Sequence, residues 1–186
     1  MKGKRIFTAM PMTVIAVLAA CMFSTCGLGL GIEEDDFEYA GFPFFINPKM
    51  GGYIFKSVIQ IEEYVDQIKK EYFDKVMVNR PSEIQKEEEH WENAIQPGFD
   101  SMFNKYNNAF FSRSNLVMVL HSDHAKTRIE IKKIGVKNNE LYVRMYRIPQ
   151  VGVRTDVVGY RCILIPIKKR EYNGTKVNIE TRTVLW

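Results

Sequence analysis

The chain contains few cysteines and few histidines. Of its 186 residues, three are cysteine and three are histidine. Cys21 and Cys26 lie near the N-terminus, so Cys162 is the only cysteine in the later part of the sequence. One cysteine cannot form a disulfide within its own domain, which excludes a small disulfide-bonded scaffold and makes packing the main source of stability.

Recognisable catalytic motifs are also missing. The sequence has no Gly-x-Ser-x-Gly elbow, no phosphate-binding loop and no dinucleotide fingerprint. Cys162 lies in an apolar stretch without a marked base, which indicates a small buried side chain. The segment His121-Ser122-Asp123-His124 has metal-like spacing, but no second cluster of ligands accompanies it. We therefore interpret it as a polar loop and predict no metal, cofactor or enzymatic activity; a hydrolase with an unmarked site is an alternative.

Charged residues are absent from residues 6–32, directly after Lys2, Lys4 and Arg5. A basic start followed by an apolar core is typical of a secretory signal peptide. The run also exceeds the roughly 20 residues that span a bilayer, so an uncleaved anchor and ordinary secretion are alternatives. Pro11 and three later glycines disfavour one continuous helix. Each alternative places the rest of the chain outside the cytoplasm.

Leu18-Ala19-Ala20-Cys21 ends the apolar core. This segment resembles the lipobox of bacterial lipoproteins. The resemblance implies that residues 1–20 are removed as a signal peptide and that Cys21 carries palmitate or a related lipid. We expect anchoring at the extracytoplasmic face of the cell membrane. Glycines and prolines interrupt residues 21–52, which predicts a lipid-attached flexible tether before a domain at residues 53–186.

The charges are divided between two halves of the sequence. The formal net charge is +4, but the chain without its first 20 residues has 23 basic and 22 acidic residues. Residues 33–100 contain 16 acidic and 7 basic residues, whereas residues 101–186 contain 6 acidic and 16 basic residues. This asymmetry indicates either attraction between the halves or a basic surface for an anionic partner.

Helical patterns occupy the first half of the domain. A short strand is predicted at residues 53–56, followed by a helix with an apolar stripe over residues 61–76. Ser82-Glu83-Ile84-Gln85 matches a capping box, predicting a helix to about residue 95. Pro97 and Gly98 are expected to end that helix, and Asp100 to cap a short one.

Strand patterns occupy the second half. Residues 116–120 are apolar throughout, and residues 160–167 are apolar on both faces apart from Arg161, which predicts strands covered on both faces. Residues 127–132 and 141–146 alternate between apolar and polar side chains. Asn138-Asn139 and Asn173-Gly174 predict hairpin turns, the second one leading into a strand at residues 175–185. The expected class is α+β, with N-terminal helices packed on a mostly antiparallel sheet of about five strands.

The sheet face turned away from the helices is predicted to be basic and rich in tyrosine. Arginine and tyrosine are favoured at binding surfaces because they provide contact area and polar groups together. The extracytoplasmic location argues against nucleic acid and favours an anionic envelope polymer or an acidic protein, with the lipid contacting the membrane. The predicted binding residues are Arg128, Lys132, Tyr142, Arg144, Tyr146, Lys176 and Arg182.

Residues 107–169 contain Ala109-Phe110-Phe111, a strand entry at Asn115-Leu116-Val117 and a later Arg147-Ile148-Pro149. This segment resembles small uncharacterised secreted or lipid-anchored proteins of Gram-positive bacteria and, more distantly, the C-terminal domain of the protease-complex subunit PrcB. The resemblance implies a non-catalytic accessory protein. We therefore expect a lipid-anchored binding or accessory protein, with an assembly or regulatory subunit of an exported protease or envelope complex as an alternative.

Overall fold

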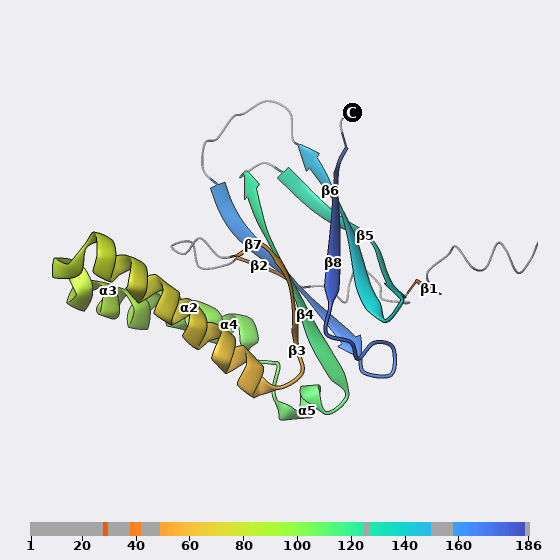
Figure 1. The fold of residues 1–186 in the computed structure, drawn as a ribbon, viewed down its shortest axis with the longest axis horizontal. Coiled ribbons are helices and arrows are strands. Elements are labelled where there is room, and N and C mark those ends of the chain that lie inside the picture. The colour runs from red at the N-terminus through yellow and green to blue at the C-terminus, as the bar shows by residue number, and fades with distance from the viewer. Residues whose placement is uncertain (1–27, 30–37, 42–48, 125–126, 150–157, 185–186) are drawn as a thin grey trace, which may run out of the picture.

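The computed structural model describes residues 28–29, 38–41, 49–124, 127–149 and 158–184. The predicted signal peptide and Cys21 lie outside these residues. The described part has three layers: helices, a middle sheet and an outer sheet (Figure 1). No helix within the described ranges is long and apolar enough to cross a membrane. The α+β class is confirmed, and the strands divide between two sheets instead of forming one.

Each sheet contains four strands. The middle sheet has the order β2-β7-β4-β3 and is antiparallel throughout, whereas the outer sheet has the order β1-β5-β6-β8. The strands are β1 (Leu28–Gly29), β2 (Glu38–Gly41), β3 (Gly51–Phe55), β4 (Ser114–His124), β5 (Thr127–Lys137), β6 (Glu140–Pro149), β7 (Val158–Lys168) and β8 (Val177–Thr183). Both β1 and β2 fall inside the predicted tether, where they pair with β5 and β7.

The two central strands of the middle sheet, β4 and β7, are buried on both faces, as their sequences predict. Alternate side chains of β4 and β7, including Leu116 and Leu164, pack against the helices. The intervening side chains, including Val117 and Ile165, pack against the outer sheet. All four of these side chains are 0% exposed. The continuous apolar runs therefore mark strands that contribute to two separate cores.

Helix α2 (Val58–Asn79) covers the first of these cores. Its apolar stripe is confirmed, because the six buried residues recur at spacings of three and four. The Ser57 side chain caps the helix by accepting a hydrogen bond from the Gln60 backbone N–H at 3.3 Å. The buried residues are Ile61, Tyr64, Val65, Ile68, Tyr72 and Val76.

The next helical segment differs from the prediction. Residues Pro81–Glu83 (η2) form a 3₁₀ turn in which Ser82 makes no capping hydrogen bond, so the capping box is wrong. The chain then continues without a break through α3 (Ile84–His90), a π-helical turn η3 (Trp91–Ile95) and α4 (Gln96–Phe103). The Gln96 N–H bonds the Trp91 carbonyl five residues back, and this wider turn gives the Pro97 ring room. Asp100 consequently lies within a helix and caps none.

One predicted hairpin is confirmed and the other is wrong. Asn138 and Asn139 have φ values of 51° and 58° and join β5 to β6. Asn173-Gly174 joins strands of different sheets, and β8 pairs in parallel with β6. The reason is Tyr172, which is 3% exposed and inserts into the core between the sheets. A Cβ atom at position 174 would lie 2.4 Å from Tyr172 Oη, so the glycine permits close packing here.

The two sheets approach each other closely where β3 and β8 form adjacent edges. A Cβ atom at Gly52 would lie 2.7 Å from the Cβ of Val177. Only a glycine therefore fits at this point of β3 without a shift of the neighbouring strand.

Candidate functional site

The predicted basic residues gather on the solvent face of the outer sheet, which we call the outer face. The register places Tyr142 beside Asn178, Arg144 beside Glu180 and Tyr146 beside Arg182 across β6 and β8. Arg128 and Lys132 lie on β5, and Lys176 comes directly before β8. The structure thus brings together the residues that the alternation predicts on one side.

Three glutamates share this face with the cations. Glu130 contacts Arg128 at 3.0 Å and also pairs with Lys132. Glu180 contacts Arg144 at 2.7 Å and Arg182 at 2.6 Å. The hydrogen bond from Lys132 lowers the pKa of Glu130, and that from Arg144 lowers the pKa of Glu180. These exposed pairs contribute little stability individually, although they hold the cations in a fixed arrangement.

Glu140 forms the third of these centres at the end of β6. It accepts hydrogen bonds from Lys176 Nζ at 2.5 Å, Asn178 Nδ2 at 2.8 Å and Tyr142 Oη at 3.1 Å. The lysine contact, followed by that of the asparagine, lowers the pKa of Glu140; the same carboxylate raises the pKa of Tyr142 and of Lys176. The Lys176 side chain therefore points from the start of β8 toward Glu140 on β6.

A hollow lies on the outer face between these charges. It has a volume of about 320 Å³, and its lining includes Lys133, Lys137, Tyr142, Arg144 and Glu180. Neither Lys133 nor Lys137 forms an ion pair with any other residue that the structure describes. The hollow therefore offers two ammonium groups outside the described ion pairs, and Glu180, the carboxylate in its lining, pairs with Arg144.

Sequence reasoning missed these two lysines because it assumed strict alternation along β5. A β-bulge between Ile131 and Lys133 shifts the register, so Lys132 and Lys133 are both exposed while Ile134 is buried. The signal was present in the spacing: Ile131 and Ile134 are both buried although they are three residues apart. In a regular strand, side chains three positions apart point to opposite faces of the sheet. Both isoleucines can therefore be buried on the same face only with such a bulge.

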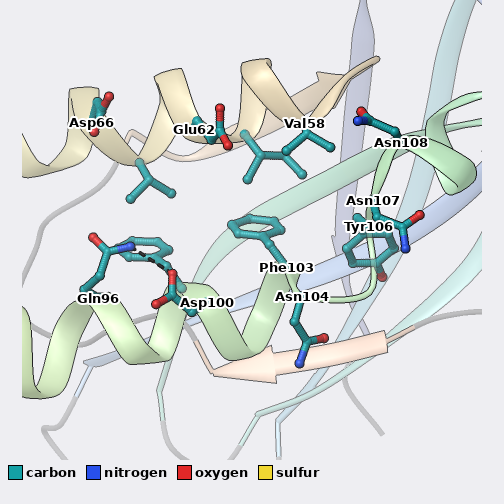
Figure 2. Close-up of a pocket in the computed structure, with 13 residues that line it drawn as sticks. Val58, Glu62, Asp66, Gln96, Asp100, Phe103, Asn104, Tyr106, Asn107 and Asn108 are labelled. Carbon is teal, nitrogen blue, oxygen red and sulfur yellow. Dashed lines mark hydrogen bonds between the residues drawn. The ribbon is translucent and has the colours of Figure 1, made fainter.

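A second concave site, which we call the helical groove, lies between α2 and α4 (Figure 2). Its volume is about 530 Å³. Figure 2 shows Glu62 and Asp66 on the α2 wall, Gln96 and Asp100 on the α4 wall, and Phe103 between them. The apolar lining consists of Val58, Ile61, Val65, Phe99, Phe103 and Tyr106. Asn104, Asn107 and Asn108 complete the lining.

Hydrogen bonds fix the α4 wall of the helical groove. Trp91 Nε1 donates to Gln96 Oε1 at 3.1 Å, and Gln96 Nε2 donates to Asp100 Oδ1 at 2.9 Å. Trp91 is 1% exposed, so this chain is anchored in the core. The Asp100 carboxylate is thereby held in place, and its second oxygen can accept a hydrogen bond from another donor. Sequence reasoning assigned Asp100 to a helix cap and did not identify the groove.

The structure also locates the other polar candidates. Cys162 is 0% exposed, with its Sγ 3.6 Å from the Ala40 carbonyl, and burial raises its pKa to about 12. It packs as a small apolar side chain, as the sequence indicates. The His121–His124 segment belongs to β4 and pairs with β7, so the predicted loop is wrong. No group of three potential metal ligands occurs within the described ranges.

The chain was compared with protein-family models, curated proteins and solved structures, and none of them matches it. The proposals below therefore depend on the outer face, its hollow and the helical groove.

Proposed function

We propose that the chain is a lipid-anchored, extracytoplasmic binding domain that acts without catalysis and binds a phosphate-bearing envelope polymer on its outer face. The observation that carries this proposal is the hollow with its two lysines, which form no ion pair with a described residue. Lys133 and Lys137 supply positive charge, and Arg144 can present a planar guanidinium to a phosphate. The hollow stands on a sheet whose other face is packed, so the strands that carry its groups are already in place before binding.

A polymer fits this face better than an isolated ion does. Arg128, Arg144 and Arg182 are exposed along three adjacent strands, and repeated phosphates can contact several of them together. The glutamate pairs do not prevent this, because exposed ion pairs contribute only about 0–1 kcal/mol each and are screened by salt. Tyr142 and Tyr146 add apolar contact area beside the charges.

The polymer proposal can be tested with the full chain in detergent micelles and labelled poly(glycerol phosphate). We expect Lys133→Gln combined with Lys137→Gln to weaken binding by about tenfold or more, because each substitution removes a positive charge from the lining of the hollow. Fluorescence anisotropy at fixed ionic strength measures the affinity. Lys70→Gln combined with Lys75→Gln makes the same charge change on exposed positions of α2 and is expected to leave binding unchanged.

Three results would contradict the polymer proposal. They are a hollow variant that binds as well as the wild type, an equal loss in the α2 variant, or tighter binding of poly-L-glutamate than of the phosphate polymer. The last result would instead favour an acidic protein as the partner.

The lipid anchor is tested by mass spectrometry of the mature N-terminus. We expect the wild-type chain to begin at Cys21 with the added mass of acyl chains, because the resemblance to a lipobox implies that this cysteine becomes the N-terminus and carries the lipid. Cys21→Ala should lack both the acyl mass and cleavage at this position, whereas Cys26→Ala should behave as the wild type. A mature wild-type chain without lipid, or one that retains residues 1–20, would overturn the assignment.

A further inference from the structure

We propose that the helical groove is a second ligand site, which binds a small organic cation carrying an apolar body. The proposal does not depend on polymer binding at the outer face, because the groove lies on the helical side of the middle sheet (Figures 1 and 2). Its volume of about 530 Å³ falls in the range of small-molecule pockets, roughly 300–1,000 Å³.

The charge of the lining selects a cation. Glu62 and Asp66 approach from α2 and Asp100 from α4, and the lining includes no lysine, arginine or histidine. Neither Glu62 nor Asp66 forms an ion pair with any residue in the described ranges. The three carboxylates therefore create a negative potential that a protonated amine entering between the helices would neutralise.

The base of the groove selects an apolar body. Phe99 is 1% exposed, Tyr106 3% and Phe103 8%, so the rings present limited surface within an otherwise packed core. An aromatic or branched aliphatic frame can cover that surface and displace water from it. Ring faces near the carboxylates would also attract a cation directly. A hydrated inorganic ion gains nothing from this base, which is why the proposed ligand is organic.

The α4 wall is organised before a ligand arrives. Gln96 uses its carbonyl oxygen toward Trp91 and one N–H toward Asp100, which fixes the carboxylate and leaves the second amide hydrogen for another acceptor. An ammonium group carries three donors, so it can bond Asp100 and a carboxylate of the α2 wall together. Such a fixed, two-sided arrangement lowers the ordering cost of binding.

Phenethylammonium and its neutral counterpart phenethyl alcohol test the proposal on the full, isotope-labelled chain in micelles. We expect the amine to shift the NMR resonances of Phe103 and Asn104 and to saturate at millimolar concentration, with the alcohol binding about tenfold more weakly. Glu62→Gln combined with Asp100→Asn should weaken the amine by about tenfold or more. Glu63→Gln combined with Asp74→Asn removes the same charge from exposed positions outside the groove and should leave its affinity unchanged.

The groove proposal fails if the alcohol binds as well as the amine, if the shifts map elsewhere, or if no saturation occurs below about 100 mM, which corresponds to a negligible affinity. It also fails if a lysine-containing peptide shifts the groove and the amine does not, because the site would then belong to a protein partner. The groove variants should retain the wild-type affinity for poly(glycerol phosphate). A loss of amine binding alone therefore separates this proposal from the one for the outer face.

Discussion

Ile165→Ala is expected to lower the free energy of unfolding by about 2–5 kcal/mol, the range for a large aliphatic side chain removed from a packed core. Ile165 is 0% exposed and belongs to the core between the two sheets. Leu164→Ala should cost a similar amount, because the neighbouring Leu164 side chain is 0% exposed in the helical core. Urea unfolding monitored by circular dichroism measures both changes.

This pair of variants tests the three-layer arrangement directly. In a single sheet with one solvated face, only one of the two neighbours would be costly. The double variant should lose nearly the sum of both values, since the side chains pack into separate cores. Val78→Ala is the matched control: Val78 is 81% exposed and should change stability by less than about 0.5 kcal/mol. A cost below about 1 kcal/mol for Ile165→Ala would contradict burial by the outer sheet.

Asn115→Asp should destabilise the protein by about 3 kcal/mol or more at pH 7, because it buries a charge without a partner. Asn115 is 0% exposed and donates from Nδ2 to the Tyr172 carbonyl at 3.1 Å and to Asn173 Oδ1 at 3.3 Å. An ionised aspartate cannot donate, so it would place a carboxylate against these two acceptors. The connection between β7 and β8 would lose the side chain that fixes it.

The same variant should have a characteristic pH dependence. Burial disfavours the charged form and raises the pKa of the introduced carboxyl group in the folded state above its unfolded value of about 3.9. The stability of the variant is therefore highest below the unfolded pKa and is lost as the pH rises through the folded pKa. Asn115→Ala removes the same hydrogen bonds without adding a titrating group, so the difference between the two variants should shrink in acid. Stability curves of the two variants that run parallel from about pH 4 to pH 8 would contradict this account.

Local periodicity predicted the elements that depend mainly on local sequence. The α2 stripe and the doubly buried strands follow from side-chain spacing, and the Asn138-Asn139 turn follows from backbone conformations that asparagine tolerates. Division of the strands into two sheets was not predictable in this way. It depends on where the Tyr172 ring packs and on the pairing of β6 with β8, which are contacts between distant segments.

The candidate sites show the same limit. Alternation placed Arg144 and Tyr146 on one face. The glutamate that pairs with Arg144 and the arginine that lies beside Tyr146 both come from β8, whose parallel register no turn signal indicates. The bulge at Ile131 made Lys133 available to the hollow. The helical groove requires α2 and α4 to pack together, and it also requires Pro97 to lie inside a continuous helix.

The close approach of β3 and β8 at Gly52 also has a consequence for solubility. An edge strand carries backbone donors and acceptors that another chain can pair with, which leads to aggregation. Here two edges from different sheets lie against each other, with Gly52 and Val177 at the contact. Each edge therefore shields the other from intermolecular strand addition, and a side chain at position 52 would separate them. The glycine thus protects the domain from self-association through these two edges.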